Sequence, residues 1–246
     1  MTKILAIVRR ELIAYFSSPL AYIVLTAFLA IQGWVFVNIV SILSGPGLPV
    51  MTPMVVFFTS AFFWFVLLVM VPLITMRLIA EERRSGTIEV LLTSPVTEGQ
   101  VIAGKFLAAL FFYLVLWLPT VLYTVILKQH SEIDVMPVVS SYLGVLTIGF
   151  LFIAVGTFAS TLSHNQLIAG VITFAVLLIL FSLGLAEQVL LSSSIFKDVI
   201  GHMNLWTHMD DYAKGIVDTR HIVYELSVGL LFLFLATKSL EVKKWR

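Results

Sequence analysis

The sequence predicts an all-α membrane protein: six transmembrane helices, an N-terminal amphipathic interfacial helix and a short cytoplasmic helix. Of its 246 residues, 60% are hydrophobic and 12% are charged, and the mean hydropathy is +1.05. A soluble domain is typically nearer half apolar and a quarter charged, so one globular core could not hide these side chains. Uncharged runs of about 20 residues, the length of a bilayer span, recur along the chain.

Six apolar segments are predicted to cross the bilayer. Five are uncharged and long enough, and these are residues 20–40, 55–76, 106–127, 137–162 and 167–186. The sixth, residues 222–237, contains Glu225 and is uncharged for only twelve residues beyond it. It spans the bilayer if Glu225 snorkels near one end, and a re-entrant hairpin is the alternative.

Two spans carry features that predict local geometry. Pro119 should kink the third span. The fourth span places Gly149, Gly156, Ser160 and Ser163 on one face, which allows close helix approach. Packing within the bundle is favoured over a dimer seam, because small residues are common inside membrane proteins.

Residues 1–17 are predicted to form a basic amphipathic helix on the inner membrane surface. Its apolar residues recur at helical spacing, and they are Ile4, Leu5, Val8, Leu12, Tyr15 and Phe16. Only five apolar residues separate Lys3 from Arg9, too few for a secretory signal. Ser18 and Pro19 fit the cap and first turn of the first span.

The distribution of Lys and Arg predicts the orientation. With both termini on one side, that side holds Lys3, Arg9, Arg10, Arg77, Arg83, Arg84, Lys105, Lys238, Lys243, Lys244 and Arg246, against Lys128, Lys197, Lys214 and Arg220 on the other. Both termini should therefore face the cytoplasm. A net charge of +1 argues against a nucleic-acid partner, and the absence of cysteine excludes disulfides and thiolate metal sites.

The segment between the second and third spans, residues 77–100, concentrates charge. It holds Arg77, Glu81, Glu82, Arg83, Arg84, Glu89 and Glu98. Residues 87–94 have a helical apolar face, Gly86 should break the helix before them, and Pro95 should end it. Thr97 and Gln100 then predict a capping box at the start of the third span.

This segment is interpreted as a short cytoplasmic helix that transmits force from a cytoplasmic partner into two spans. The alternative is that its charges only satisfy the positive-inside rule. That rule does not require Glu81, Glu82 and Glu89, so the transmitting role is favoured.

Three stretches resemble a known family. "EERRSGTIEVLLTSPVT" resembles the E-E-x-x-x-G-T-x-E-x-L-x-x-x-P segment of permease subunits of ABC-2 type exporters, and "AKGIVDTRHIVYELS" resembles the segment before their last span. The opening "RRELIAYFSSPLAYIVL" is similar to the gliding-motility-associated branch. The three stretches occur in the family's order, and the resemblance covers essentially the whole chain.

The resemblance implies a dimeric six-helix permease of the bacterial inner membrane, coupled to separate cytoplasmic ATPase subunits. ATP and magnesium would bind the ATPase, and this chain would hold no cofactor. A companion membrane protein with a large extracytoplasmic domain is also implied. The implied coupling residues are Glu81, Glu82, Arg83, Arg84, Gly86, Thr87 and Glu89, and the extracytoplasmic family segment holds Gly215, Asp218, Arg220 and Tyr224. His221 departs from the family pattern, in which an acid is expected.

Two patterns imitate chemical sites. GQVIAGK, residues 99–105, fits a phosphate-binding loop but lacks the terminal Ser or Thr and a preceding strand, so Lys105 is interpreted as a snorkelling anchor. His202, His208, Asp210 and Asp211 have no helical ligand spacing, so a metal site is not favoured. They belong to an extracytoplasmic amphipathic segment, residues 187–221, in which Asp218 should cap the last helix.

No Asp, Glu, Lys or Arg falls near mid-bilayer in the predicted spans, which argues against a gradient-driven carrier. Residues 1–246 are thus expected to form one membrane domain, a permease that couples partner ATP hydrolysis to substrate movement or force transmission and is not itself an enzyme. The alternative is a non-transporting scaffold or receptor subunit that docks a partner through residues 77–98. An intramembrane enzyme comes third, because no catalytic constellation lies at depth.

Overall fold

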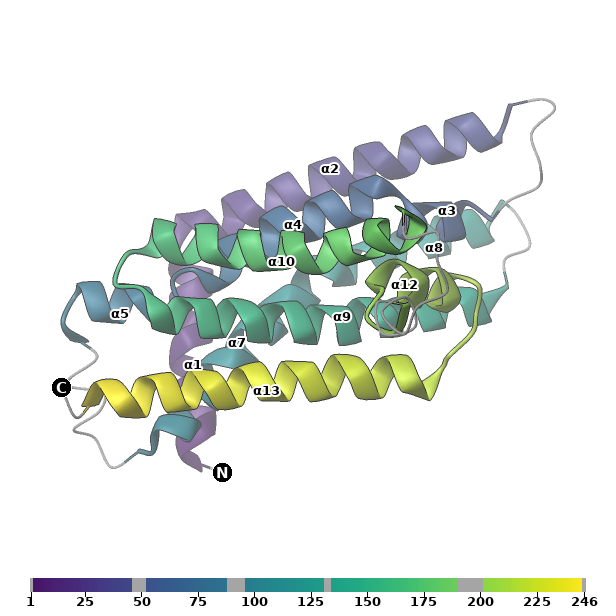
Figure 1. The fold of residues 1–246 in the computed structure, drawn as a ribbon. Helices are drawn as coiled ribbons and strands as arrows, with labels where there is room; N and C mark the ends of the chain where they lie inside the picture. Colours follow the sequence, from purple (N-terminus) through teal and green to yellow (C-terminus); the bar gives the residue numbers. More distant parts are fainter. Residues whose placement is uncertain (1, 46–51, 88–95, 131–133, 190–200, 245–246) are drawn as a thin grey trace.

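The computed structural model describes residues 2–45, 52–87, 96–130, 134–189 and 201–244, and within them every regular element is helical. Figure 1 shows the long helices lying side by side along one direction, with α1 (Thr2–Ser17) running crosswise to them. The predicted all-α membrane fold class is confirmed.

Among the residues that the structure describes, six helical stretches are long and apolar enough to cross a membrane. They are α2 (Pro19–Leu43), Ala61–Arg84, Glu98–Lys128, α9 (Val135–Leu162), the Gln166–Gly184 part of α10 (Gln166–Val189), and Thr219–Val242 within α13 (Thr219–Lys244). The last segment is one continuous helix of 26 residues, so it has the length of a full span and is not a re-entrant hairpin.

The second span differs from the prediction, because residues 55–76 do not form one helix. The chain forms α3 (Pro53–Thr59), breaks at Ser60, and resumes as α4 (Ala61–Thr75). Ser60 is extended, and its Oγ accepts a hydrogen bond from the N–H of Phe63 at 3.2 Å. A serine that caps the next helix in this way competes with continuous helix across the position.

The third span has the predicted capping box at its start and an irregular turn at Pro119, where the sequence predicts a kink. Thr97 and Gln100 form the capping box at the start of α7 (Glu98–Trp117). Pro119 lies in a single 3₁₀ turn, η1 (Leu118–Thr120), before α8 (Val121–Lys128). Proline lacks the N–H that would continue the α-helical ladder, so the helix changes its hydrogen-bond pattern there.

α9 is the most buried of the six spans, and its small residues face neighbours within the chain. A methyl group at Gly149 would overlap the ring of Tyr113, and one at Gly156 would overlap Thr75. Ser160 bonds to the chain that follows α4. The interpretation of this face as packing inside the bundle is confirmed, with the close approach that small residues allow between helices in lipid.

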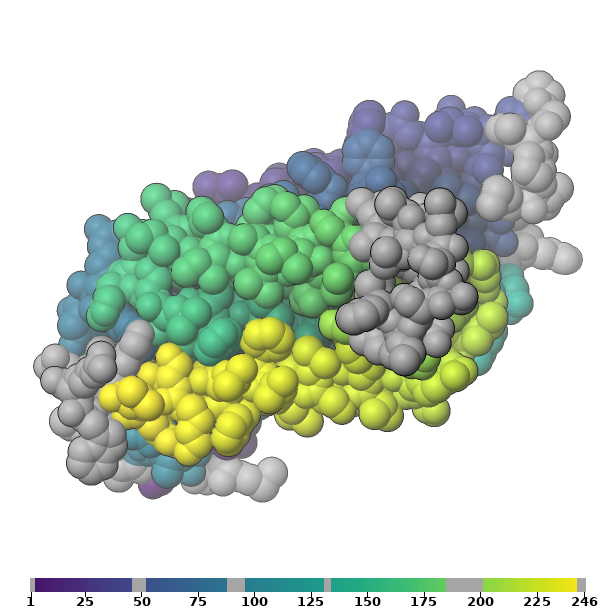
Figure 2. Space-filling model, viewed as in Figure 1, coloured from purple at the N-terminus to yellow at the C-terminus, as the bar shows by residue number. Residues whose placement is uncertain are grey.

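Figure 2 shows one face of the bundle covered largely by α10 and α13. Several of their side chains are among the most exposed large hydrophobic residues that the structure describes, including Leu167, Val171, Ile179, Val223 and Leu230. Exposed apolar surface of this extent on a helical bundle is suited to lipid.

The two ends of the bundle carry different elements (Figure 1). Both termini lie at the same end as α5 (Ala80–Arg84), and this is called the terminal end. α12 (Leu205–Ala213) and the start of α13 lie at the opposite end, called the α12 end.

Single cysteines can test which end faces the cytoplasm, because the chain has none of its own. The Lys and Arg bias predicts that Ser85→Cys, at the exposed terminal end, is shielded from an impermeant thiol reagent added outside the cell. Gln129→Cys, exposed after α8, should react. The opposite labelling would reverse the orientation.

Candidate functional site

The base of the charged segment is fastened to α9. The Ser160 Oγ accepts hydrogen bonds from the N–H groups of Ile79 at 3.0 Å and Ala80 at 3.1 Å. The guanidinium of Arg83 donates to the carbonyl oxygen of Thr161 at 2.5 Å. Because the first N–H groups of a helix have no partner within it, a buried hydroxyl there fixes where α5 begins.

The residues predicted to contact an ATPase divide into inward and outward groups. Glu82 and Arg83 are partly buried, whereas Glu81 and Arg84 are exposed. The Glu81 carboxylate lies 3.4 Å from the Arg77 guanidinium, with half of the Glu81 side chain accessible.

The predicted helix break at Gly86 is confirmed. Gly86 has a φ of +71°, a conformation that other residues rarely adopt. The hydroxyl of Thr87 lies 2.9 Å from that of Ser85. Glu89 and the amphipathic helix predicted at residues 87–94 fall, apart from Thr87, outside the described residues.

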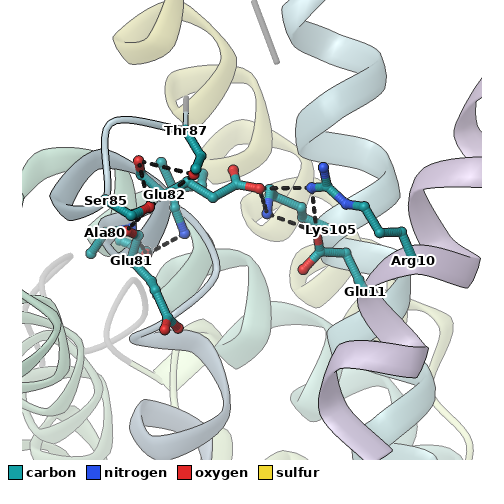
Figure 3. Close-up of polar contacts among 10 residues, drawn as sticks. Arg10, Glu11, Ala80, Glu81, Glu82, Ser85, Thr87 and Lys105 are labelled. Carbon is teal, nitrogen blue, oxygen red and sulfur yellow. Dashed lines mark hydrogen bonds and ion pairs between the residues drawn. The ribbon is translucent and has the colours of Figure 1, made fainter. Parts of the chain in front are cut away.

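Four charged side chains form a closed ring beside α5 (Figure 3). The Arg10 Nη2 lies 2.7 Å from both Glu11 Oε1 and Glu82 Oε1. The Lys105 Nζ lies 3.0 Å from the same oxygen of Glu11 and 3.1 Å from that of Glu82. Two cations thus alternate with two carboxylates, which come from α1 and α5, while Lys105 comes from α7. The ring is electrically neutral.

Lys105 is not a snorkelling anchor, which corrects the sequence interpretation. Its side chain is only 1% exposed, against 51% for Arg10. A buried ammonium is tolerated because two carboxylates meet it, and their attraction is stronger than it would be in water. The Lys105 ammonium contacts the carboxylates of Glu11 in α1 and Glu82 in α5. The side chain therefore ends at these two groups, whereas a snorkelling lysine extends to solvent.

A cavity of about 370 Å³ opens beside the ring. Ala14 and Tyr15 of α1 line one part, and Arg77, Leu78 and Glu81 line another. α1 and the start of the charged segment are therefore separated by space here, and charged side chains bridge it.

At the α12 end, aromatic rings seat α12 against the bundle. Trp206 stacks on Trp64 with ring centroids 5.6 Å apart, and its indole N–H donates to the Phe181 carbonyl at 3.2 Å. Tyr212 occupies the space left by Gly144 of α9. The segment that was predicted to lie at the membrane interface thus packs, through α12, against α3, α9 and α10.

Glu225 does not snorkel, contrary to the sequence interpretation. Its side chain is fully buried, with Oε1 3.1 Å from His208 Nδ1 and Oε2 accepting from the Tyr212 hydroxyl at 3.4 Å. Burial raises the pKa of Tyr212, and the nearby Glu225 carboxylate raises it further, so the phenol stays protonated and donates. The polar side of α12 therefore supplies partners that make snorkelling unnecessary.

A second pair extends this cluster toward the surface. His221 Nε2 lies 2.9 Å from Asp211 Oδ2, and the His221 ring stacks on His208 with centroids 3.9 Å apart. His221, the position that departs from the family pattern, thus contacts α12. Asp210 pairs with Lys214 instead. The described residues include no group of three or more His, Asp or Glu arranged to hold a metal ion.

The four residues of the family segment that was predicted to be extracytoplasmic do not converge on one site. Gly215, with φ +87°, follows α12 in the turn toward α13. Asp218 accepts from the N–H of Arg220 at 2.8 Å, which fits its predicted capping role. Hydrogen bonds from the Arg220 side chain and backbone lower the pKa of Asp218 to about 2. Tyr224 lies edge-on to His208.

Sequence reasoning missed both clusters. Its one available signal was a charged residue at the edge of an apolar span, as with Lys105 and Glu225. His208 lies 17 residues before Glu225 in the sequence, and Glu11 lies 94 residues before Lys105. No local periodicity in the sequence connects residues so far apart.

The buried His208–Glu225 pair should be strongly interdependent. Either His208→Leu or Glu225→Leu strands a buried polar partner and should lower the free energy of unfolding by about 3–5 kcal/mol. The double variant removes both groups, so its loss should be smaller than the sum of the single losses. Thermal unfolding in detergent measures this, with exposed Glu241→Leu as the control. Additive losses would show that the pair is not coupled.

Comparison with known proteins identifies the family of this chain. A search of curated proteins finds no match. A family model described as "ABC-2 family transporter protein" matches residues 52–199, more than half of the chain. The match begins just before α3 and includes the charged segment, α9 and α10. The chain therefore belongs to the ABC-2 family of transporter proteins, as a multi-pass membrane permease subunit of an ABC transporter.

Proposed function

We propose that this chain is half of the membrane part of an ATP-driven exporter, with two copies working beside two cytoplasmic ATPase subunits. Family membership implies an ABC ATPase partner. The excess of Lys and Arg at the terminal end supports a cytoplasmic position for residues 77–100. The similarity of the N-terminal stretch to gliding-motility-associated permeases supports that branch.

The attachment of α5 to α9 by hydrogen bonds is the observation that carries the proposal. Ser160 and Arg83 bond this short helix to α9, while Glu81 and Arg84 remain exposed. A surface helix held rigidly from below and charged on its outer side is suited to receive a partner and to pass on its displacement. Movement of α5 would pass directly to α4, which precedes it in the same helical stretch, and to α9.

ATP binding would draw the two ATPase subunits together and displace the segment of each permease copy. The resulting tilt of the second and third spans would open a path at the interface of the two copies. ATP and magnesium would stay on the ATPases. The exporter would move a substrate or transmit force to a companion membrane protein with a large extracytoplasmic domain.

The chain alone should neither bind nor hydrolyse ATP. GQVIAGK is part of helix α7, and Lys105 is committed to two carboxylates, so neither a loop nor a free ammonium is offered to phosphate. Equilibrium binding of labelled ATP to the purified permease measures this. Saturable binding that Lys105→Met abolishes would contradict it.

Charge removal on the outer side of α5 should weaken ATPase docking. Glu81→Ala with Arg84→Ala should reduce the affinity for the ATPase about tenfold or more, because charges desolvated at an interface are worth more than about 1 kcal/mol. Affinity is measured by titrating ATPase onto permease in nanodiscs. The matched control is Lys238→Ala with Glu241→Ala, an exposed pair at the same end.

Equal affinity of the two double variants would remove α5 from the docking surface. A scaffold or receptor subunit would dock an ATPase without nucleotide-dependent movement. Unchanged thiol accessibility of single cysteines along α2 and α4, with and without trapped nucleotide, would favour that alternative.

A further inference from the structure

Glu82 faces away from the exposed side of α5. Its Oε1 contacts both Arg10 and Lys105 within 3.1 Å, and its side chain is 17% exposed. A carboxylate engaged in this way has little capacity to meet a partner protein. Glu82 and the outward Glu81 are therefore adjacent in sequence but serve different surfaces.

Beside the ring, α1 is attached firmly to α7. Ile7 packs so closely on Gly104 that a methyl group there would meet its side chain at 2.7 Å. The Tyr15 ring stacks on Phe112 at 5.0 Å, and the Tyr15 hydroxyl donates to the Ile74 carbonyl at 2.7 Å. α1 is thus packed on α7 along most of its length and hydrogen-bonded to α4.

Between α1 and α5, by contrast, charged contacts bridge a cavity. The ring supplies the direct Arg10–Glu82 contact and the indirect contact from Glu11 through Lys105 to Glu82. Without Lys105, two carboxylates would face each other with only the half-exposed Arg10 between them. Their repulsion, weakly compensated at the solvent side, would push α5 away from α1.

We propose that Lys105 is a positioning residue that joins α1 to the coupling segment, so that the crosswise helix α1 moves with α5 as one unit. This inference rests on the proposed coupling function and adds a second route by which the displacement of α5 reaches the spans. Glu82 then acts through Lys105 and Arg10, and it does not contact the ATPase. Displacement of α5 reaches α7 through the ring as well as α4 and α9 through the backbone and Ser160.

Paired spin labels at Arg9→Cys and Ser85→Cys can test the unit, since both positions are exposed and lie outside the ring. Double electron–electron resonance spectroscopy of the labelled permease in nanodiscs should give one narrow distribution of distances between the two labels. That distance should stay unchanged when the ATPase complex is trapped with nucleotide and vanadate. A nucleotide-dependent shift in the otherwise wild-type chain would overturn the proposal.

Lys105→Met should at least double the width of this distance distribution, and Lys105→Arg should restore it. The matched control is Lys238→Met, which removes an exposed lysine from the same end and should leave the width unchanged. Glu82→Gln provides a second variant, because it loosens α5 while Lys105 keeps Glu11 as its partner. An unchanged width in either Lys105→Met or Glu82→Gln would refute the role of the ring.

The permease measured alone separates this inference from the proposed function. If no ATPase binds the wild-type chain, the proposed coupling function is wrong. The effect of Lys105→Met on the width of the distance distribution would still show whether the ring holds α1 and α5 together. If ATPase binds Glu82→Gln with wild-type affinity while the width increases, Glu82 acts as a positioning residue. A loss of affinity at unchanged width would instead make Glu82 a contact residue.

Discussion

Close packing against α9 holds most of the other elements in place. In lipid, apolar side chains gain little by leaving their surroundings, so helices associate through van der Waals contact and hydrogen bonds. Small residues at Gly144, Gly149 and Gly156 let Tyr212, Tyr113 and Thr75 reach the backbone of α9. Ser160, near the end of the same helix, bonds the start of α5. One helix therefore positions both α12 and the start of the charged segment.

Ionisable groups are buried near the two ends of the bundle, and each is met by groups from another element. Lys105 meets carboxylates from α1 and α5, and Glu225 meets His208 and Tyr212 from α12. A single buried charge would cost several kcal/mol, whereas neutral sets are tolerated where water is scarce. These polar contacts also have direction, so each fixes the position of a short helix that apolar packing alone would hold less specifically.

The arrangement at the terminal end suits a part that receives force. α5 is short, and helices of this length are not stable by themselves. Three sets of contacts fix its position: the Ser160 hydroxyl and the Thr161 carbonyl of α9, the latter bonded to Arg83, and the charged ring. Rigidity at the base leaves Glu81 and Arg84 as the accessible charges, and the positive φ of Gly86 redirects the chain beyond them.

Local signals in the sequence predicted much of the fold. The six spans follow from runs of apolar residues, and the Thr97–Gln100 capping box, the Pro119 irregularity and the Gly86 break follow from the backbone chemistry of single residues. Ser60 shows where such reasoning fails, since a serine within an apolar run carries too weak a signal to predict a break. The family resemblance rested on contiguous motifs, and the match over residues 52–199 bears out its coarser part.

Sequence by itself determined that the chain is a six-span helical membrane protein with a charged segment between its second and third spans, because hydrophobic length and local turn chemistry are properties of contiguous residues. Only the tertiary structure decided which charges face inward. Glu81 and Glu82 are neighbours of the same type, yet one is exposed and the other is partly buried against Lys105. Likewise, the sequence predicts that Glu225 extends to water, whereas in the structure α12 places His208 and Tyr212 against its carboxylate. The energy of a charge depends on the groups that surround it, and distant parts of the chain supply those groups only after folding.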